Sequence, residues 1–92
     1  MKVKAEDLGT GRSLNLSADQ TSMFSKELAL IKKRPPFRKL PPTLAPDTRI
    51  TVSDGKKKTE YELYNRFLLY EPKSKKGWFF YFGVLLSLWV NK

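Results

Sequence analysis

The sequence contains no cysteine and no histidine. Without cysteine, neither a disulfide nor a thiolate metal site can hold a small fold together, so its stability must come from packing. Without histidine, the chain lacks the side chain that most often acts as an acid or base near neutral pH and most often binds transition metals. We therefore expect a protein that is not an enzyme, with no metal site, no cofactor and no small-molecule substrate.

Long apolar runs are also missing. The longest covers residues 78–90, which is shorter than the roughly 20 residues that a helix needs to cross a bilayer. The sequence therefore predicts no transmembrane span. Residues 1–7 contain lysines but no apolar stretch follows them, so no signal peptide is visible and we favour a cytoplasmic location.

Positive charge and aromatic rings are abundant. Lysine and arginine number 18 against 9 carboxylates, a net charge of +9, which favours acidic proteins, nucleic acid or an anionic lipid surface as partners. Aromatic residues make up 13% of the 92 residues, more than a minimal core requires. We expect one folded domain, although a chain this short buries only about 60–65% of the surface that its unfolded form exposes.

The first half of the chain predicts a tail, a helix and a linker. Residues 1–16 show no apolar period and are expected to form a flexible tail. Ser17 and Gln20 have the spacing of a capping box, which predicts a helix over residues 18–34 that ends before Pro35. Residues 35–48 hold most of the prolines and predict a stiff linker, because the spacing that proline-binding domains require is not met.

A hairpin is predicted next. Residues 49–53 alternate between apolar and polar, and Asp54 and Gly55 supply a strong turn signal. A loop of residues 54–57 pairs apolar with apolar and positive with negative side chains. The expected cross-strand pairs are Ile50 with Tyr61, Val52 with Thr59, and Arg49 with Glu62.

The last third predicts two further strands. We assign residues 59–70 to the second strand, residues 71–77 to a turn, and residues 78–90 to the third strand, with Glu71 opposite Trp78. An alternative ends the strand near Phe82 and forms a short helix over residues 83–91, against which the absence of a polar face argues mildly. The predicted fold is α+β: one N-terminal helix on a three-stranded antiparallel β-meander, with a proline-rich crossover and a disordered N-terminal tail.

This register divides the apolar side chains between two faces of the sheet. One face forms the expected core: Ile50, Val52, Tyr61, Leu63, Phe67, Leu69, Phe80, Phe82, Val84, Leu86 and Leu88. The other is too apolar for a face that meets water, and a single helix covers only one face. The partner-binding surface is therefore predicted to consist of Tyr64, Leu68, Tyr70, Phe79, Tyr81 and Trp89.

Two short patterns invite a catalytic interpretation. Glu60 and Glu62 share a strand face, but opposite Arg49 they are expected to form solvent-side pairs. Ser53 and Lys56 have the Ser-x-x-Lys spacing of acylating enzymes, which requires a serine at the start of a helix rather than before a hairpin turn. Neither pattern is assigned a catalytic role.

Six lysines are candidate anion-binding residues: Lys56, Lys57, Lys58, Lys73, Lys75 and Lys76. We expect the two sets at opposite ends of the middle strand with aromatic rings between them, a layout typical of nucleic-acid-binding sheets. Lysine-rich turns can instead keep a small sheet soluble and block edge pairing, and we favour this role for the lysines over nucleic-acid binding. The sequence thus predicts a small basic non-catalytic interaction module that binds a protein partner or a second copy of itself, in an accessory, inhibitor or immunity-type role. Nucleic-acid binding is the alternative.

Overall fold

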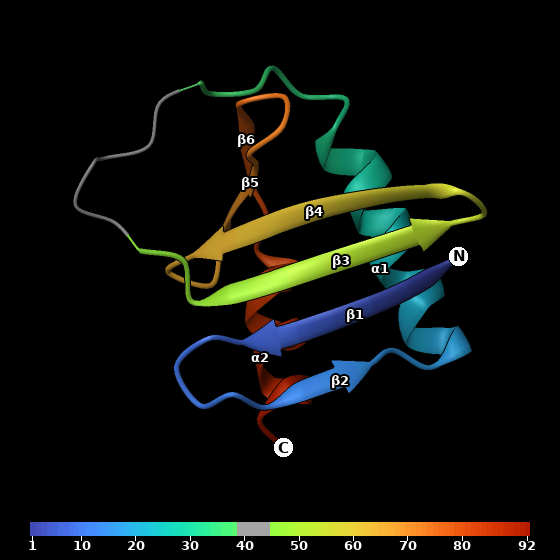
Figure 1. Cartoon of the computed structure of the whole chain (residues 1–92). Coiled ribbons are helices and arrows are strands. Elements are labelled where there is room, and N and C mark those ends of the chain that lie inside the picture. Colours follow the sequence, from blue (N-terminus) through green and yellow to red (C-terminus); the bar gives the residue numbers. More distant parts are fainter. Residues whose placement is uncertain (39–44) are drawn as a thin grey trace.

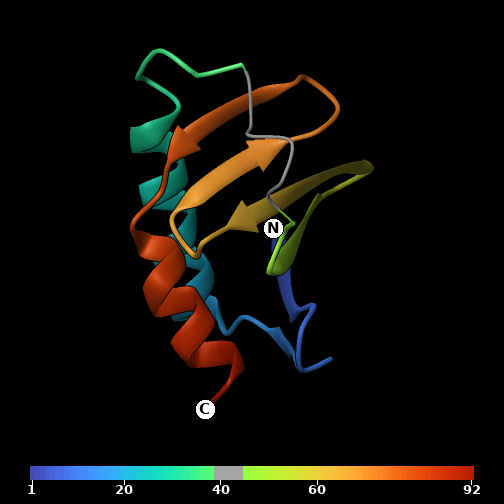
Figure 2. The ribbon, with the colours of Figure 1, turned by 90° about the vertical axis from the view of Figure 1, so that its left-hand side faces the viewer.

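The protein is a six-stranded antiparallel sheet with both helices on one of its faces (Figures 1 and 2). The computed structural model describes residues 1–38 and 45–92. The strands lie in the order β2-β1-β3-β4-β5-β6. The elements are β1 (Lys2–Asp7), β2 (Ser13–Asn15), α1 (Ala18–Ile31), β3 (Thr48–Asp54), β4 (Lys57–Tyr64), β5 (Leu68–Glu71), β6 (Lys76–Phe79) and α2 (Phe82–Val90). The prediction of three strands and one helix is therefore wrong, although the α+β class holds.

The N-terminal segment is part of the sheet, so the prediction of a flexible tail over residues 1–16 is wrong. β1 lies between β2 and β3, where Val3 pairs with Val52 and Ala5 pairs with Ile50. Val3 and Ala5 are buried, while the residues on either side of them face out. The alternation of lysine with a small apolar residue is a strand pattern, but two apolar side chains gave too weak a signal.

Helix α1 begins as predicted and ends earlier. Ser17 Oγ accepts a hydrogen bond from the Gln20 backbone N–H at 3.2 Å, and Gln20 Oε1 accepts one from the Ser17 N–H at 2.9 Å, which completes the capping box. The helix ends at Ile31, three residues before the expected end at residue 34, and a tighter turn follows it. Its buried residues are Phe24, Leu28 and Ile31, whose spacing places them on one side of the helix.

The linker is described only in part, because residues 39–44 of the predicted proline-rich segment lie outside the described residues. At its start, Phe37 exchanges two backbone hydrogen bonds with Gly77, on the outer edge of β6. At its end, Thr48 begins β3.

The β3–β4 hairpin has the predicted register. The expected pairs Ile50 with Tyr61, Val52 with Thr59, and Arg49 with Glu62 are all present. The strands extend one residue further than expected, so that Asp54 pairs with Lys57 and the loop consists of Gly55 and Lys56. Gly55 has φ 64°, a conformation that costs a glycine nothing.

The predicted second strand is two strands, because the chain reverses after Tyr64. β4 and β5 pair with each other, with Leu63 opposite Leu69. Asn65 and Arg66 make the turn with φ values of 52° and 66°, a region that costs a residue with a Cβ atom about 1 kcal/mol or more. Asparagine tolerates this region better than most residues, and Asn65 is the sequence signal that the strand assignment overlooked.

Three contacts hold this strained turn. The Arg66 N–H donates to Asp47 Oδ2 at 2.9 Å. The Phe67 carbonyl accepts from the Phe80 N–H. Gly83 of α2 packs so closely on the Arg66 carbonyl that a Cβ at this position would lie 2.3 Å from its oxygen. Such strain persists where the surrounding structure fixes the backbone from several sides.

The predicted third strand is wrong in its second half. β6 ends at Phe79 and residues 82–90 form α2, as in the alternative with a C-terminal helix. Glu71 pairs with Lys76 instead of Trp78. Because a shift of two residues leaves each side chain on its own face, the predicted division of faces survives for the residues of β5 and β6.

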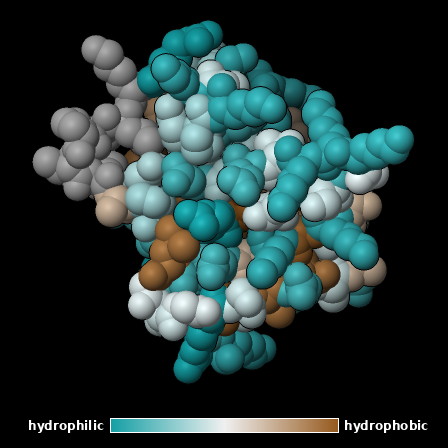
Figure 3. Space-filling model, in the orientation of Figure 1, coloured by the Kyte–Doolittle hydropathy of each residue, from teal (hydrophilic) through white to brown (hydrophobic). Residues whose placement is uncertain are grey.

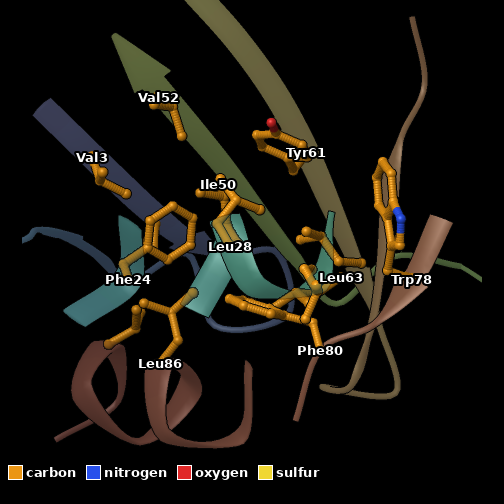
Figure 4. Close-up of a cluster of buried hydrophobic side chains, with 14 residues drawn as sticks. Val3, Phe24, Leu28, Ile50, Val52, Tyr61, Leu63, Trp78, Phe80 and Leu86 are labelled. Carbon is orange, nitrogen blue, oxygen red and sulfur yellow. The ribbon is translucent and has the colours of Figure 1, made fainter. Parts of the chain in front are cut away.

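The core is a single layer between the sheet and the two helices (Figure 4). Phe24 of α1 meets Phe80 edge to face, with ring centroids 5.8 Å apart and planes at 88°, a favourable geometry for aromatic pairs. Leu86 brings α2 into the same cluster as Ile50 and Leu63 of the sheet. Away from the helices, mainly hydrophilic side chains cover the sheet (Figure 3). Neither helix in the described part of the chain is long and apolar enough to span a membrane.

Replacing Gly83 with alanine tests how α2 is held on the turn. Alanine favours a helix over glycine by about 1 kcal/mol, but its Cβ would meet the backbone oxygen of Arg66. We expect Gly83→Ala to lower the free energy of unfolding by about 1–3 kcal/mol in a urea titration. Val84→Ala, at a position that is 46% exposed on the same helix, is the control and should change it by under about 0.5 kcal/mol. A Gly83→Ala protein as stable as the wild type would contradict this packing.

Asp7 gives a pH-dependent test of the β1–β2 turn. The Thr10 N–H, the Asn91 side chain and the Gly9 N–H hold the pKa of this carboxyl below its usual value of 3.8. A lowered pKa stabilises the fold above the unfolded value, and that stability is lost as pH falls through the folded value. We expect Asp7→Asn to cost no more than about 0.5 kcal/mol at neutral pH, because solvent screens this accessible carboxyl, measured by thermal unfolding. The difference from wild type should shrink below pH 3.8, and a difference that is constant down to strongly acidic pH would contradict the assignment.

Candidate interaction surface

Three aromatic rings stack outside the core where β6 leads into α2. The rings of Phe67, Phe79 and Tyr81 have centroids 5.8–6.4 Å apart and lie within 5–11° of parallel. Phe37 adds a tilted ring, 5.8 Å from Phe79. Phe79 is 53% exposed and Tyr81 is 70% exposed. Their neighbours Trp78 and Phe80 are buried, so Phe79 and Tyr81 point away from the core. A cluster of large exposed rings on a small protein often marks an interaction site.

The outer side of α2 continues this apolar surface. Val84 follows Tyr81 by three residues, and Leu88 follows Val84 by four, so the three share one side of the helix. Val84 is 46% exposed and Leu88 is 61% exposed. No residue of α2 is charged, and its inner side is already used by Gly83, Leu86, Ser87 and Val90 against the core. We call the surface formed by the half-buried Phe67 and the exposed Phe79, Tyr81, Val84 and Leu88 the apolar strip.

Basic side chains lie at both ends of the apolar strip. Arg66 is exposed and directly precedes Phe67. At the other end, Lys92 lines a shallow hollow of about 420 Å³ with Leu85, Leu88, Trp89 and Asn91. Arg12 also reaches this end, where it donates to the Asn91 carbonyl at 3.1 Å. Acidic groups on a partner would be electrostatically complementary to these basic side chains.

The six predicted partner-binding residues are only partly brought together. The register places Tyr64, Leu68, Tyr70 and Phe79 on one face of the sheet, as the sequence predicts, but Tyr64 is buried and Leu68 and Tyr70 are half-buried. Tyr81 joins through its ring stack with Phe79. Trp89 does not join them, since it lies on α2 and packs edge to face on Phe82.

Sequence reasoning missed three residues of the apolar strip, Phe67, Val84 and Leu88, by assigning them to the core face. Phe67 lies in the β4–β5 turn, which Asn65 signals. Val84 and Leu88 point outward because the segment is a helix and not a strand. A period of three and four residues from Tyr81 to Leu88 could have indicated this.

Tyr64 is distinguished by its ionisation. Burial, with the negative charge of Glu62 and the hydrogen bond that the Tyr64 hydroxyl donates to Glu62 Oε1 at 3.1 Å, raises the pKa of Tyr64 to about 12. Its ring also meets that of Tyr70 edge to face. Tyr64 is therefore a buried packing residue of β4, and its hydroxyl already has a partner.

Three of the six predicted anion-binding lysines, Lys57, Lys58 and Lys73, line one hollow, and the two sets are not at opposite ends of a strand. Because the chain reverses after Tyr64, the β3–β4 turn and the β5–β6 turn are at the same end of the sheet. Lys57, Lys58 and Lys73 line one hollow of about 560 Å³ with Thr59, Glu60, Glu71 and Ser74. The aromatic rings are at the other end, so the expected layout of rings between two rows of lysines is wrong.

No group of three or more histidine, cysteine or carboxylate side chains that could hold a metal ion occurs in residues 1–38 and 45–92. No protein-family model, no curated protein and no solved structure matches this chain.

The four tyrosines allow the burial of Tyr64 to be tested in solution. A folded pKa of about 12, above the ordinary value of 10, means that neutral Tyr64 stabilises the fold below pH 10 and that this contribution is lost as pH rises through 12. We expect the tyrosinate absorbance to include an ionisation near pH 12 that is absent in Tyr64→Phe. A late step that persists in Tyr64→Phe would assign it to another residue.

Proposed function

We propose that the protein is a small non-catalytic interaction module that binds an acidic protein partner through the apolar strip. The observation that carries the proposal is the exposure of Phe79, Tyr81 and Leu88, each more than half open to solvent, in one continuous surface. Protein interfaces are built around such aromatic and aliphatic anchors, with a polar rim around them.

The charge of the chain favours an acidic partner over a second copy. Each copy carries a net charge of +9, and Arg66, Arg12 and Lys92 lie at the ends of the strip. Two copies that met through this surface would bring like charges together, whereas acidic groups around an apolar patch would pair with them and speed the encounter. Salt screens these charges over about 8 Å, so their effect is on specificity and rate more than on affinity.

Substitutions in the strip should separate binding from folding. Leu88 is 61% exposed and Leu86 is fully buried on the same helix. We expect Leu88→Ser to change the free energy of unfolding by under about 0.5 kcal/mol. Leu86→Ser should lower it by about 3 kcal/mol or more, because it also buries a hydroxyl. A large loss of stability in Leu88→Ser would mean that this residue serves the core and not a partner.

The partner is identified by site-specific crosslinking. A photoreactive residue replaces Leu88 in the cells that make the protein, and the same residue at Lys4, on the sheet face away from the helices, is the control. We expect an adduct with an acidic protein from position 88 only. With that protein purified, Leu88→Ser and Tyr81→Ser should each weaken binding at least tenfold. Adducts shared by both positions, an adduct between two copies of this chain, or full binding by both serine variants would contradict the proposal.

Nucleic-acid binding is the second candidate, and the ring stack of Phe67, Phe79 and Tyr81 favours it, since bases stack on such rings. Its weakness is that the lysines of both turns gather at the other end of the sheet. A single-stranded oligonucleotide distinguishes the candidates. Phosphate binding should fall steeply between low and moderate salt, whereas binding through an apolar surface responds little.

A further inference from the structure

The ladder between β4 and β5 stops short, and a proline explains where. Only three pairs form, from Glu62 with Tyr70 to Tyr64 with Leu68. If the same register continued, Pro72 would face Glu60, and a proline has no N–H to donate. The two strands diverge beyond this point, and Figure 1 shows β5 and β6 crossing the direction of β4.

The hydrogen bonds of the neighbouring strands fix which way the unpaired groups of β4 point. The Phe67 carbonyl accepts from the Phe80 N–H in the register of β5 with β6, so Phe67 and Leu69 direct their backbone groups to β6. Successive residues alternate, so Leu68 and Tyr70 direct theirs to β4. Glu62 and Tyr64 then face β5, and by the same alternation so do Lys58 and Glu60.

Lys58 and Glu60 therefore present their N–H and C=O groups to the place where β5 has left the sheet. These groups open on the hollow of about 560 Å³ that both residues line. In residues 1–38 and 45–92, no strand or side chain pairs with them. We call these backbone groups the open edge.

Positive charge surrounds the open edge. Lys57, Lys58 and Lys73 line the hollow, and of its two carboxylates Glu71 already faces Lys32, with Nζ 3.8 Å from Oε1. Ser74 Oγ is also buried beside the hollow and has no hydrogen-bond partner among the described residues. A strand edge with this charge discourages pairing with a second copy, which would bring the same lysines.

The two ends of the sheet are closed in other ways. Phe37 pairs with Gly77 on the outer edge of β6. β2, at the opposite end, has only three residues, and short edge strands pair poorly with added chains. The open edge thus lies inside the sheet order, between β4 and a strand that diverges from it.

We propose that the open edge receives an extended acidic segment of a protein partner, added to β4 as a short strand. Its backbone pairs with the N–H and C=O groups of Lys58 and Glu60, and its carboxylates meet Lys57, Lys58 and Lys73. Strand addition of this kind takes its affinity from main-chain hydrogen bonds and its specificity from the side chains. The site is separate from the apolar strip, and its existence does not depend on the function proposed above.

The test uses an eight-residue peptide of alternating glutamate and valine, with two matched peptides. In one, alternate backbone nitrogens are methylated, which removes the donors of one edge and leaves the charge. In the other, lysine replaces glutamate. We expect the parent peptide to bind by calorimetry and both matched peptides to bind at least tenfold more weakly. Equal binding of the methylated peptide would show attraction by charge alone and would overturn the proposal, as would the absence of binding by the parent.

Amide hydrogen exchange locates the peptide on the protein. In the free protein, the amides of Thr59 and Tyr61 face β3 and should be protected, whereas those of Lys58 and Glu60 should exchange fast. The parent peptide should slow exchange at Lys58 and Glu60. Protection of these two amides before the peptide is added, or a change confined to β2 or to the apolar strip, would overturn the proposal.

Variants of the protein complete the test. Glu60→Pro removes a donor that faces the hollow and leaves the ladder with β3 intact, so binding should fall at least tenfold in a folded protein. Lys58→Glu with Lys73→Glu should do the same, whereas Lys26→Glu with Lys33→Glu, two exposed lysines on and just after α1, is the charge-matched control and should reduce binding by less than twofold. Leu88→Ser should leave peptide binding unchanged, which separates this site from the apolar strip. Equal losses in the double variant on α1 and in the double variant at the hollow would contradict a defined site.

Discussion

The reversal of the chain at Asn65 and Arg66 determines where every candidate surface lies. Because β4 and β5 run back along each other, the β3–β4 and β5–β6 turns lie at one end of the sheet, where Lys57, Lys58 and Lys73 line one hollow. The same reversal places Phe67 at the other end, where it stacks on Phe79 and Tyr81. The turn adopts a costly backbone conformation, which Asp47 and the close packing of Gly83 hold in place.

The two helices differ in how much apolar surface they leave exposed, and this difference follows from their composition. α1 has an ordinary amphipathic pattern, so it buries Phe24, Leu28 and Ile31 and presents mostly polar residues to water. α2 is apolar all round but has a core on only one side. Among the described residues, Val84 and Leu88 stay exposed on the outer side of α2, and this exposed apolar surface is the reason why we propose a protein partner.

Much of the middle of the fold could be predicted from the sequence. The capping box of Ser17 and Gln20 and the whole β3–β4 register follow from local hydrogen bonding and from pairing rules with a clear period. The errors fell where the local signal was weak or where the tertiary context decided. β1 shows only Val3 and Ala5 as apolar residues, and its burial depends on pairing with β3, far away in the sequence. The segment after Phe79 is apolar whether extended or helical, so its periodicity does not choose.

Binding through the predicted surface stays a prediction, but the structure shows which of its residues are exposed. An aromatic surface beyond the needs of the core does exist, and Phe79 and Tyr81 belong to it. Overlooking a single turn moved the lysines to the wrong ends, assigned Phe67 to the core, and gave Tyr64 a role in binding that its burial contradicts. Errors of this kind spread because one reversal changes the position of every later residue in the sheet.

The most direct test of this account is a nuclear Overhauser experiment on the Hα atoms of Leu63 and Leu69. These residues lie opposite each other as a pair without mutual hydrogen bonds, in which the two Cα atoms are only about 4.5 Å apart. The reversal at Asn65 and Arg66 predicts a strong Hα–Hα contact between them. A continuous strand through residues 59–70 would separate the two residues by about 20 Å, and the absence of the contact in the folded protein would contradict the fold and the position of both proposed surfaces.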